Sequence, residues 1–438
     1  MKFSGARPIW ACEDTGNLMA LDERKLAVAD LRTGMYVCRL DRDWEGTPFL
    51  LQGVMVESQA DIDALAALCA HVYIDLERGI GPSGLGLLSL DDLSMPQHTS
   101  EAPVAKVFRD ADIRALQGST SYPEQVDFEQ ELADAREAQV QAAAFASRVL
   151  DDVRNGRPIA PDDVRAAVEP MVRSLVRNAD AFLWLDTLRE RGAYEYTHAL
   201  GCSALAAAFG RHVGLPEPLL VDLASGALLL DIGKLRVDPA LLASAGVFTA
   251  EEHRAMRAHV AHALAILDES AAVPEHVREM VRTHHEHVDG AGYPAGASGD
   301  AVPLLGRIAA VVDAYDAMTS DRPHRPAVGQ HVALQALYRD RGTRYAPEVV
   351  EQFMQCMSVY PIGSLVELST GEVAIVMAQN AARRLQPRVM VLTAPDKQLL
   401  TAFHSVDLMV RAHGDEPVRI VAPLAPGAHG LDPVALFL

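Results

Sequence analysis

Short stretches of alternating apolar and polar residues open the chain, whereas most of the remainder follows a helical period. Four runs near the N-terminus alternate in this way and carry β-branched residues, which predicts strands. These runs are 25–31, 34–40, 47–56 and 71–76. The Ala and Leu spacing of 61–70 predicts one helix before the last strand. The pattern therefore predicts a small N-terminal α+β module, to which we assign residues 1–86.

The rest of the chain divides by its pattern into four further segments. Residues 87–122 have no sustained period and predict a linker. The charged, Ala-rich pattern of 123–180 predicts connecting helices, one of which begins with Pro161 in its first turn. Residues 181–345 predict a helical domain with short turns, and 346–438 predict a C-terminal helix followed by a β segment.

One helix start inside the helical domain is marked by a capping box. Thr249 is followed three residues later by Glu252, ahead of an apolar-periodic run. This pattern predicts a single helix over 253–267, with His259 and His262 on one face.

The composition favours a mainly helical protein. The 438 residues are 49% hydrophobic but only 5% aromatic, with many Ala-rich stretches. A formal charge of −20 argues against a broad surface for nucleic-acid polymers or anionic membranes, although it allows a local basic pocket.

The cysteines and the apolar runs indicate the cytoplasm. The five cysteines lack the spacing of a disulfide framework or a thiolate metal site. The N-terminus has no signal-peptide pattern, and no apolar run reaches the roughly 18 residues of a membrane span. We therefore predict a cytoplasmic protein without a membrane span.

Histidines gather in the helical domain, where ten of the sixteen fall between residues 198 and 324. The densest stretch reads HHEHVDGAGYP, from His284 to Pro294. Adjacent histidines can reach one ion where a helix ends and its last turn loosens, and Gly290 and Gly292 mark such an end. The alternative is an ordinary polar helix terminus followed by a turn.

Five motifs together resemble the HD-GYP family of metal-dependent phosphodiesterases that act on cyclic di-GMP. They are YTHAL at His198, LLLDIGK at 228–234, AHVAHALAIL around His259, HHEHVDGAGYP, and GRIAAVVDAYDAMTSDRPHR at 306–325. The N-terminal module and the C-terminal β segment are also similar to segments often found beside such domains. The resemblance implies a helical HD-superfamily domain with a small N-terminal α+β module and a short C-terminal β segment.

Six side chains form the candidate metal set: His198, Asp231, His259, His284, His285 and Asp313. Imidazole and carboxylate donors without a thiolate fit iron best, in one or two ions, with manganese as the alternative. The resemblance implies that Asp231 bridges two ions. It places His259, His284 and His285 on one ion, and His198 and Asp313 on the second. Asp231 and Lys234 are the implied catalytic residues.

The family's substrate-binding positions match a second group of residues. Lys234, Arg322 and Arg325 match those that contact the substrate phosphates, and Arg is suited to two phosphate oxygens at once. Tyr293 is expected to stack on the ligand or to hydrogen-bond to it. Asp316 is a further substrate-binding candidate, which could instead orient a ligand or complete the helix face.

Two departures from the family pattern concern the metal ligands. Leu230 stands where the family has the histidine of its His-Asp pair, so the ion shared by His198 and Asp313 should bind weakly. Tyr194 stands where some relatives have a glutamate that holds a third metal, so we expect no third ion.

These departures leave several functions open. The first is an active phosphodiesterase whose second ion is completed by water or by His262. The second is a degenerate member that binds a cyclic dinucleotide or docks a diguanylate cyclase domain. A nucleotide phosphohydrolase is a third reading, disfavoured by the intact GYP loop. The sequence does not decide among cyclic dinucleotides or whether the chain forms a homodimer.

Overall fold

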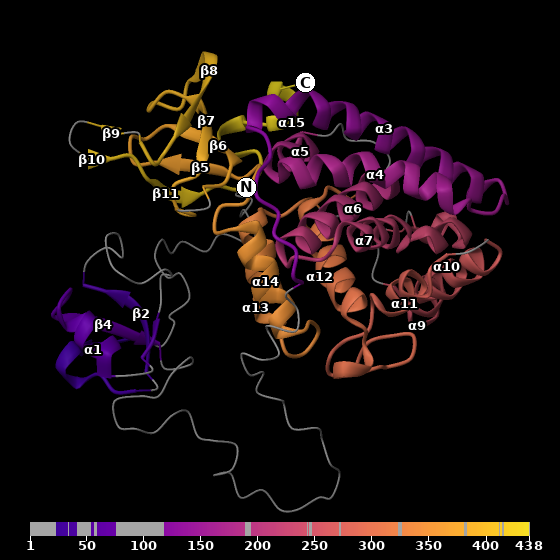
Figure 1. Cartoon of the computed structure of the whole chain (residues 1–438), viewed down its shortest axis with the longest axis horizontal. Helices are drawn as coiled ribbons and strands as arrows, with labels where there is room; N and C mark the ends of the chain where they lie inside the picture. The colour runs from indigo at the N-terminus through magenta and orange to yellow at the C-terminus, as the bar shows by residue number, and fades with distance from the viewer. Residues whose placement is uncertain are drawn as a thin grey trace, which may run out of the picture. The chain divides into compact units, whose positions relative to one another are not determined.

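The computed structural model forms two compact units, Met1–Pro103 and Val104–Leu438, which we treat separately (Figure 1). The residues described are 23–33, 35–41, 54–56, 59–75, 118–188, 194–242, 244, 248–270, 273–322, 326–380, 383–410, 412–413 and 416–437. Arg325 and most of the predicted linker 87–122 lie outside this set. The boundaries at 86 and 122 therefore remain predictions. Within the described part of the chain, no helix combines the length and apolar character needed to cross a bilayer.

The first unit contains a four-stranded antiparallel sheet in the order β1-β4-β2-β3. Its elements are β1 (Glu23–Ala27), β2 (Tyr36–Leu40), β3 (Val54–Met55), α1 (Gln59–Ala66) and β4 (His71–Asp75). Alternate strand residues such as Val72 and Ile74 are buried, together with Leu65 of α1. The predicted α+β character is confirmed, although only Val54–Met55 of the predicted strand 47–56 is described as strand.

The second unit is built mainly of helices. They are α3 (Phe128–Arg154), α4 (Pro161–Arg177), α5 (Ala179–Thr187), α6 (Tyr194–His212), α7 (Glu217–Leu229), α8 (Pro239–Leu242), α9 (Ala250–Arg257), α10 (His259–Asp268), α11 (Glu275–Thr283), α12 (Leu304–Thr319), α13 (Gln330–Arg339), α14 (Pro347–Met357) and α15 (Pro433–Phe437). The 3-10 turn η3 (Ile232–Arg236) follows α7. Pro161 stands in the first turn of α4, as predicted.

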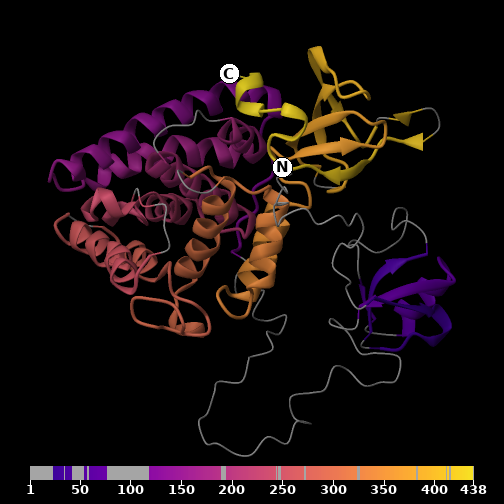
Figure 2. The same ribbon diagram turned by 180° about the vertical axis from the view of Figure 1, so that it is seen from behind.

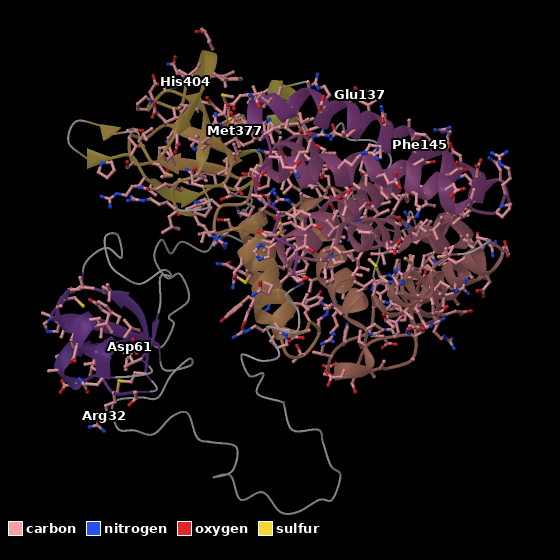
Figure 3. The ribbon with its side chains drawn as sticks, viewed as in Figure 1. Arg32, Asp61, Glu137, Phe145, Met377 and His404 are labelled. Atoms are coloured by element: carbon pink, nitrogen blue, oxygen red, sulfur yellow. The ribbon has the colours of Figure 1, made fainter. Side chains whose placement is uncertain are left out.

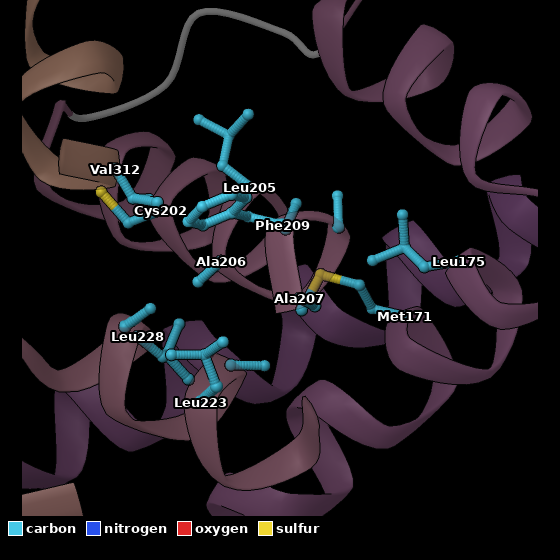
Figure 4. Close-up of a cluster of buried hydrophobic side chains, with 14 of the residues drawn as sticks. Met171, Leu175, Cys202, Leu205, Ala206, Ala207, Phe209, Leu223, Leu228 and Val312 are labelled. Carbon is cyan, nitrogen blue, oxygen red and sulfur yellow. The ribbon is translucent and has the colours of Figure 1, made fainter. Parts of the chain in front are cut away.

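Helix α6 is the central element of this unit. Residues 201–210 are buried on every side, as expected for a helix without a polar face. It packs against α4, α7 and α12. Figure 4 shows Cys202, Leu205 and Phe209 of α6 between side chains of these neighbours. His198 on α6 and Asp313 on α12 are thus held by one shared core, which also includes α7.

A five-stranded antiparallel sheet in the order β11-β5-β6-β7-β8 forms the C-terminal part. Its strands are β5 (Leu365–Leu368), β6 (Val373–Ala378), β7 (Arg388–Thr393), β8 (Leu399–Asp407) and β11 (Ile420–Pro423), beside the small pair β9 (Ala412–His413) and β10 (Glu416–Pro417). The sheet lies near the start of α3, where Arg388 pairs with Glu129 (Figures 1 and 2). Figure 3 shows Met377 on β6 and His404 on β8. The sequence predicted only the first three strands.

The predicted single helix over 253–267 is wrong, because α9 ends at Arg257 and α10 begins at His259. The capping box itself is present: the Thr249 N–H donates to Glu252 Oε2 (2.7 Å), and the Glu252 N–H donates to Thr249 Oγ1 (3.2 Å). At the break, the carbonyl of Met256 accepts from the His259 ring instead of serving a regular helical turn. His259 therefore occupies a helix start.

Candidate metal centre

The six predicted metal ligands come from five segments of the helical unit. His198 lies on α6, Asp231 caps η3, His259 begins α10, His284 caps α11 with His285 next to it, and Asp313 lies on α12. Helix α12 packs on α6 and α11, while α10 packs on η3. The adjacent histidines stand where α11 ends, as the sequence predicted.

The first group of ligands comprises Asp231, His259, His284 and His285, with one ligand atom from each within 4.8 Å of the others. Two of the imidazoles are oriented by the backbone. The Nδ1 atom of His259 lies 2.7 Å from the carbonyl oxygen of Met256, and that of His284 lies 2.8 Å from the Val281 carbonyl. A proton on each Nδ1 leaves the lone pair on Nε2, which is the form that binds a metal.

Three ligand atoms in this group are buried without a hydrogen-bond partner among the described residues. They are Asp231 Oδ1, His259 Nε2 and His284 Nε2. A buried polar atom left unpaired costs about 1 to 3 kcal/mol, so several at one point call for an explanation. The donors are imidazole nitrogens and a carboxylate oxygen, which suit a transition-metal ion. The residues present therefore fit a metal.

Burial also keeps two of the imidazoles in the metal-binding form. It lowers the pKa of His285 well below the usual value, and electrostatic repulsion between the His285 and His284 rings adds to this shift. Burial likewise lowers the pKa of His259, although Asp231 opposes the shift. Neutral imidazoles are the ligands that a cation requires.

The second group comprises His198, Asp231 and Asp313. His198 Nε2 lies 3.0 Å from Asp313 Oδ1 and 3.4 Å from Asp231 Oδ2. Burial opposes ionisation of both His198 and Asp313. The hydrogen bond from His198 nevertheless lowers the pKa of Asp313, and the pKa of His198 is raised by Cys202 and by hydrogen bonds to Asp231, Asp313 and Asp316. Asp231 is shared by both groups. Among the described residues, His262 belongs to none of the candidate metal groups.

Leu230 directly precedes Asp231 of this second group but adds no ligand to it. Its side chain is 1% exposed and belongs to the main hydrophobic core. A leucine side chain offers no lone pair to a metal. The second group thus has three protein ligands, compared with four in the first.

Asp316 lies behind His198 rather than at an open surface. Its Oδ2 atom is 2.6 Å from His198 Nδ1 and accepts a hydrogen bond from Ser320 Oγ (3.2 Å). The residue is 5% exposed. Cys202 Sγ lies 3.7 Å from the same ring nitrogen. These contacts are those of a residue that orients a metal ligand, which differs from the predicted contact with substrate.

Lys234 lies one turn after Asp231, and its ammonium group donates a hydrogen bond to Asp231 Oδ2. Burial would raise the pKa of Asp231, but the positive charge of Lys234 and the bond from His198 hold it well below its usual range. Gly233, between them, packs directly on α10. A Cβ atom there would lie 1.9 Å from the carbonyl oxygen of His259. No sequence pattern predicts this role of Gly233, and the close approach is visible only in the structure.

The GYP loop is anchored by Glu286, a second residue to which the sequence analysis gave no role. Its buried carboxylate accepts hydrogen bonds from the N–H groups of Ala295 (2.7 Å) and Ala297 (3.0 Å). The Tyr293 ring then lies on the His285 ring, with centroids 4.7 Å apart and planes at 31°. Its place directly after the paired histidines was the only sequence signal for Glu286.

A cavity of about 360 Å³ lies beside the metal ligands His284, His285 and Asp313. Pockets for small ligands typically measure about 300 to 1,000 Å³. Arginines on its wall include the predicted Arg322 and two that the sequence analysis did not consider, Arg339 and Arg344. The cavity thus combines metal ligands with fixed positive charge, although the whole chain is acidic.

Comparisons with known proteins agree with this arrangement. Residues 173–349 match the HD domain family, and residues 23–164 match a domain of unknown function, DUF3391. The cyclic di-GMP phosphodiesterase PA4108 of Pseudomonas aeruginosa is 30% identical over 387 residues, which are 88% of this chain and 89% of that protein. A cyclic di-GMP phosphodiesterase of Thermotoga maritima is 32% identical over 39% of this chain and 46% of its own length. The 3'3'-cGAMP-specific phosphodiesterase 2 of Vibrio cholerae is 29% identical over 44% of this chain and 35% of its own length.

Proposed function

This chain belongs to the HD-GYP family of HD-domain phosphodiesterases, and from that membership we propose that it hydrolyses a phosphodiester bond of cyclic di-GMP at this metal centre. The observation that carries the proposal is the meeting of three buried ligand atoms, on Asp231, His259 and His284, that have no hydrogen bond among the described residues. Two of them, Asp231 Oδ1 and His259 Nε2, lie 3.4 Å apart. A polar cluster built only for stability would give these atoms hydrogen bonds.

The two groups of ligands suggest how ions are held. Asp231, His259, His284 and His285 would hold one ion, and His198, Asp231 and Asp313 would hold the other. The mixture of imidazole and carboxylate favours iron, with manganese as the alternative. Bound there, the ions would supply Lewis-acid chemistry, which neutralises phosphoryl charge and makes water a stronger acid.

The chain's own residues then bind and orient the substrate. Lys234 places an ammonium group beside Asp231, where it can also meet a phosphate oxygen. Arg322 offers a guanidinium from the cavity wall, and Tyr293 offers a ring face beside His285. Asp316 holds the His198 ring in one orientation. Arg325 completes the set as a substrate contact carried by the resemblance.

Leu230 favours a second candidate function, which is binding with little or no hydrolysis. Because the second ion has three protein ligands, its occupancy should depend on the metal supplied. Such a protein would bind a cyclic dinucleotide and act through a partner, for example a diguanylate cyclase domain. A related ligand such as cGAMP also fits the chemistry of the pocket, since it carries the same two phosphodiester groups.

Metal content read beside turnover tests the proposal. Purified protein loaded with Fe(II) or Mn(II) should consume cyclic di-GMP, as followed by chromatography, and should hold at least one ion by elemental analysis. The double variant His284→Ala/His285→Ala should lose both the ion and the turnover. His276→Ala is the matched control, because His276 lies at the surface and pairs with Asp222. Unchanged metal content in the double variant would show that His284 and His285 are not metal ligands.

A further inference from the structure

Two arginines outside the family motifs line the same cavity as the metal ligands. Arg339 ends α13, and Arg344 lies in the turn that follows, while His285 and Asp313 line the cavity with them. Their guanidinium groups keep much of their surface open, since the side chains are 70% and 51% exposed.

Asp340 lies between these two arginines. Its Oδ1 atom is 3.1 Å from Arg339 Nε, and its Oδ2 atom is 3.6 Å from Arg344 Nη1. One carboxylate therefore holds two guanidinium groups close together, and the three side chains carry one net positive charge. An anionic group bound there would complete the charge balance, and guanidinium geometry suits two oxygens of a phosphate.

The turn that carries Arg344 is attached to the motif loop. The N–H of Asp289 donates to the carbonyl of Thr343 (3.0 Å), and the N–H of Val288 donates to that of Arg344 (3.3 Å). Arg344 is thus held beside the residues that precede Tyr293.

A cyclic dinucleotide carries two phosphodiester groups, and the metal centre can take only one of them. We propose that Arg344, held by Asp340 beside Arg339, binds the phosphodiester that is not being cleaved. This subsite rests on the proposed function, and it makes the pocket prefer ligands with two phosphodiesters over ligands with one.

Affinities for two matched ligands test the subsite. Metal-loaded protein is titrated by calorimetry with cyclic di-GMP and with the linear dinucleotide GpG, which has the same bases but one phosphodiester. Arg344→Ala should weaken cyclic di-GMP binding roughly tenfold or more, as expected for the loss of a charge-assisted hydrogen bond, and should change GpG binding less than about twofold. Arg344→Lys should recover part of the loss, since it restores the charge without the planar fork.

Arg341→Ala is the control for a general change in surface charge. Arg341 lies in the same turn, but its guanidinium stacks on the Tyr338 ring at 3.5 Å and donates to the Tyr338 carbonyl (2.7 Å). Arg341 is not among the described residues that line the cavity.

Four results would overturn the subsite. Wild-type affinity in Arg344→Ala, or an equal loss in Arg341→Ala, would do so while leaving the proposed function standing. An equal loss for GpG would mean that Arg344 acts on the cleaved phosphate instead. Wild-type protein that binds neither ligand would remove the proposed function, and the subsite with it.

Discussion

Leu230 fills a core position directly before a metal ligand, so its side chain serves packing where the family has a donor. Replacing it with histidine should raise the metal content toward two ions per chain and raise turnover of cyclic di-GMP more than affinity. The variant should also lose about 1 to 3 kcal/mol of unfolding free energy before metal is added, because a polar ring enters the core. Elemental analysis and chromatography measure the first two effects, and denaturant titration measures the third.

Leu230→Ala provides the comparison for that variant, since it loses packing and gains no donor. It should be destabilised without any rise in metal content. If Leu230→His gains no metal, or if wild-type protein already holds two ions and turns over rapidly, the role assigned to Leu230 fails.

Lys234 lies beside Asp231 and Arg322 lies on the cavity wall, so the two cations predict variants with different effects. Each alanine variant should weaken cyclic di-GMP binding by about 1.5 to 3 kcal/mol, as for a charged hydrogen bond. Lys234→Ala should also reduce metal retention, because Lys234 holds Asp231 in its ionised form. Arg322→Ala should retain its metal. Calorimetry measures the binding of cyclic di-GMP to both variants, and elemental analysis measures their metal content. Equal metal loss in Lys234→Ala and Arg322→Ala would contradict the different roles assigned to the two residues.

At the scale of elements, the contact between η3 and α10 decides how Asp231 meets His259. Gly233→Ala should place a Cβ atom 1.9 Å from the carbonyl oxygen of His259 and 2.5 Å from the backbone nitrogen of Ala263, so the backbone must move. We expect a loss of a few kcal/mol in unfolding free energy, together with loss of metal. Thermal unfolding and elemental analysis check both effects.

Gly226→Ala supplies the matched control on α7. There the new Cβ would meet the flexible side chain of Met280, with Sδ at 2.6 Å, and a methionine can move aside. This variant should lose less stability than Gly233→Ala and should keep its metal. If Gly226→Ala lost more stability than Gly233→Ala, the contact between η3 and α10 would not be the one that limits stability.

The GYP loop depends on the buried carboxylate of Glu286. Glu286→Gln keeps the shape but replaces one acceptor oxygen with a donor that faces the N–H of Ala295 or Ala297. We expect a loss of about 1 to 3 kcal/mol in unfolding free energy and a higher KM, because Tyr293 loses its fixed place beside His285. Denaturant titration and steady-state kinetics measure these effects. An unchanged KM would show that the anchoring of the loop by Glu286 does not affect substrate binding.

Helix and strand periods account for how well the elements could be predicted. The helices that carry His198 and Asp313 are long, largely apolar runs, and the paired histidines mark their own helix end. The break at Ala258 has no Gly or Pro to signal it, because it depends on the His259 ring reaching the Met256 carbonyl. Strand β8 was missed because its residues are largely exposed and follow no alternation.

At the scale of the whole molecule, local sequence patterns give types of elements but not which of them meet. The motifs identified the six candidate ligands through a family resemblance. Arg339 and Arg344, at the end of α13 and in the turn after it, line the same cavity as three of these ligands. This follows from tertiary packing, which the periodicity of a sequence does not encode. The burial of Asp316 behind His198 could not be predicted either, since its spacing on α12 fits both a pocket and a supporting position.

The contact between the helical part and the C-terminal sheet contains a carboxyl group with an unusual pKa. Asp180 on α5 accepts a hydrogen bond from the N–H of Gln379, just after β6 (2.7 Å). Burial raises the pKa of Asp180 to about 7, although that backbone hydrogen bond opposes the shift. In the unfolded chain an aspartate has a pKa of about 3.9. The folded protein therefore binds a proton that the unfolded chain has lost, over the range from about pH 4 to pH 7.

Because the folded state holds the extra proton, unfolding free energy should fall as pH rises through this range and level off above about pH 7. Asp180→Asn keeps an acceptor for the Gln379 N–H but cannot ionise, so its stability should fall less between pH 5 and pH 8, by about 1 to 3 kcal/mol. Denaturant titrations of both proteins at the two pH values measure this difference. Groups such as His198 titrate in both proteins, so the difference between them isolates Asp180.

Asp162→Asn, at an exposed position on α4, is the control and should show the pH dependence of the wild type. Equal pH dependence in Asp180→Asn and wild type would show that Asp180 is ionised in the folded protein at pH 5, and that the junction carries a charge there.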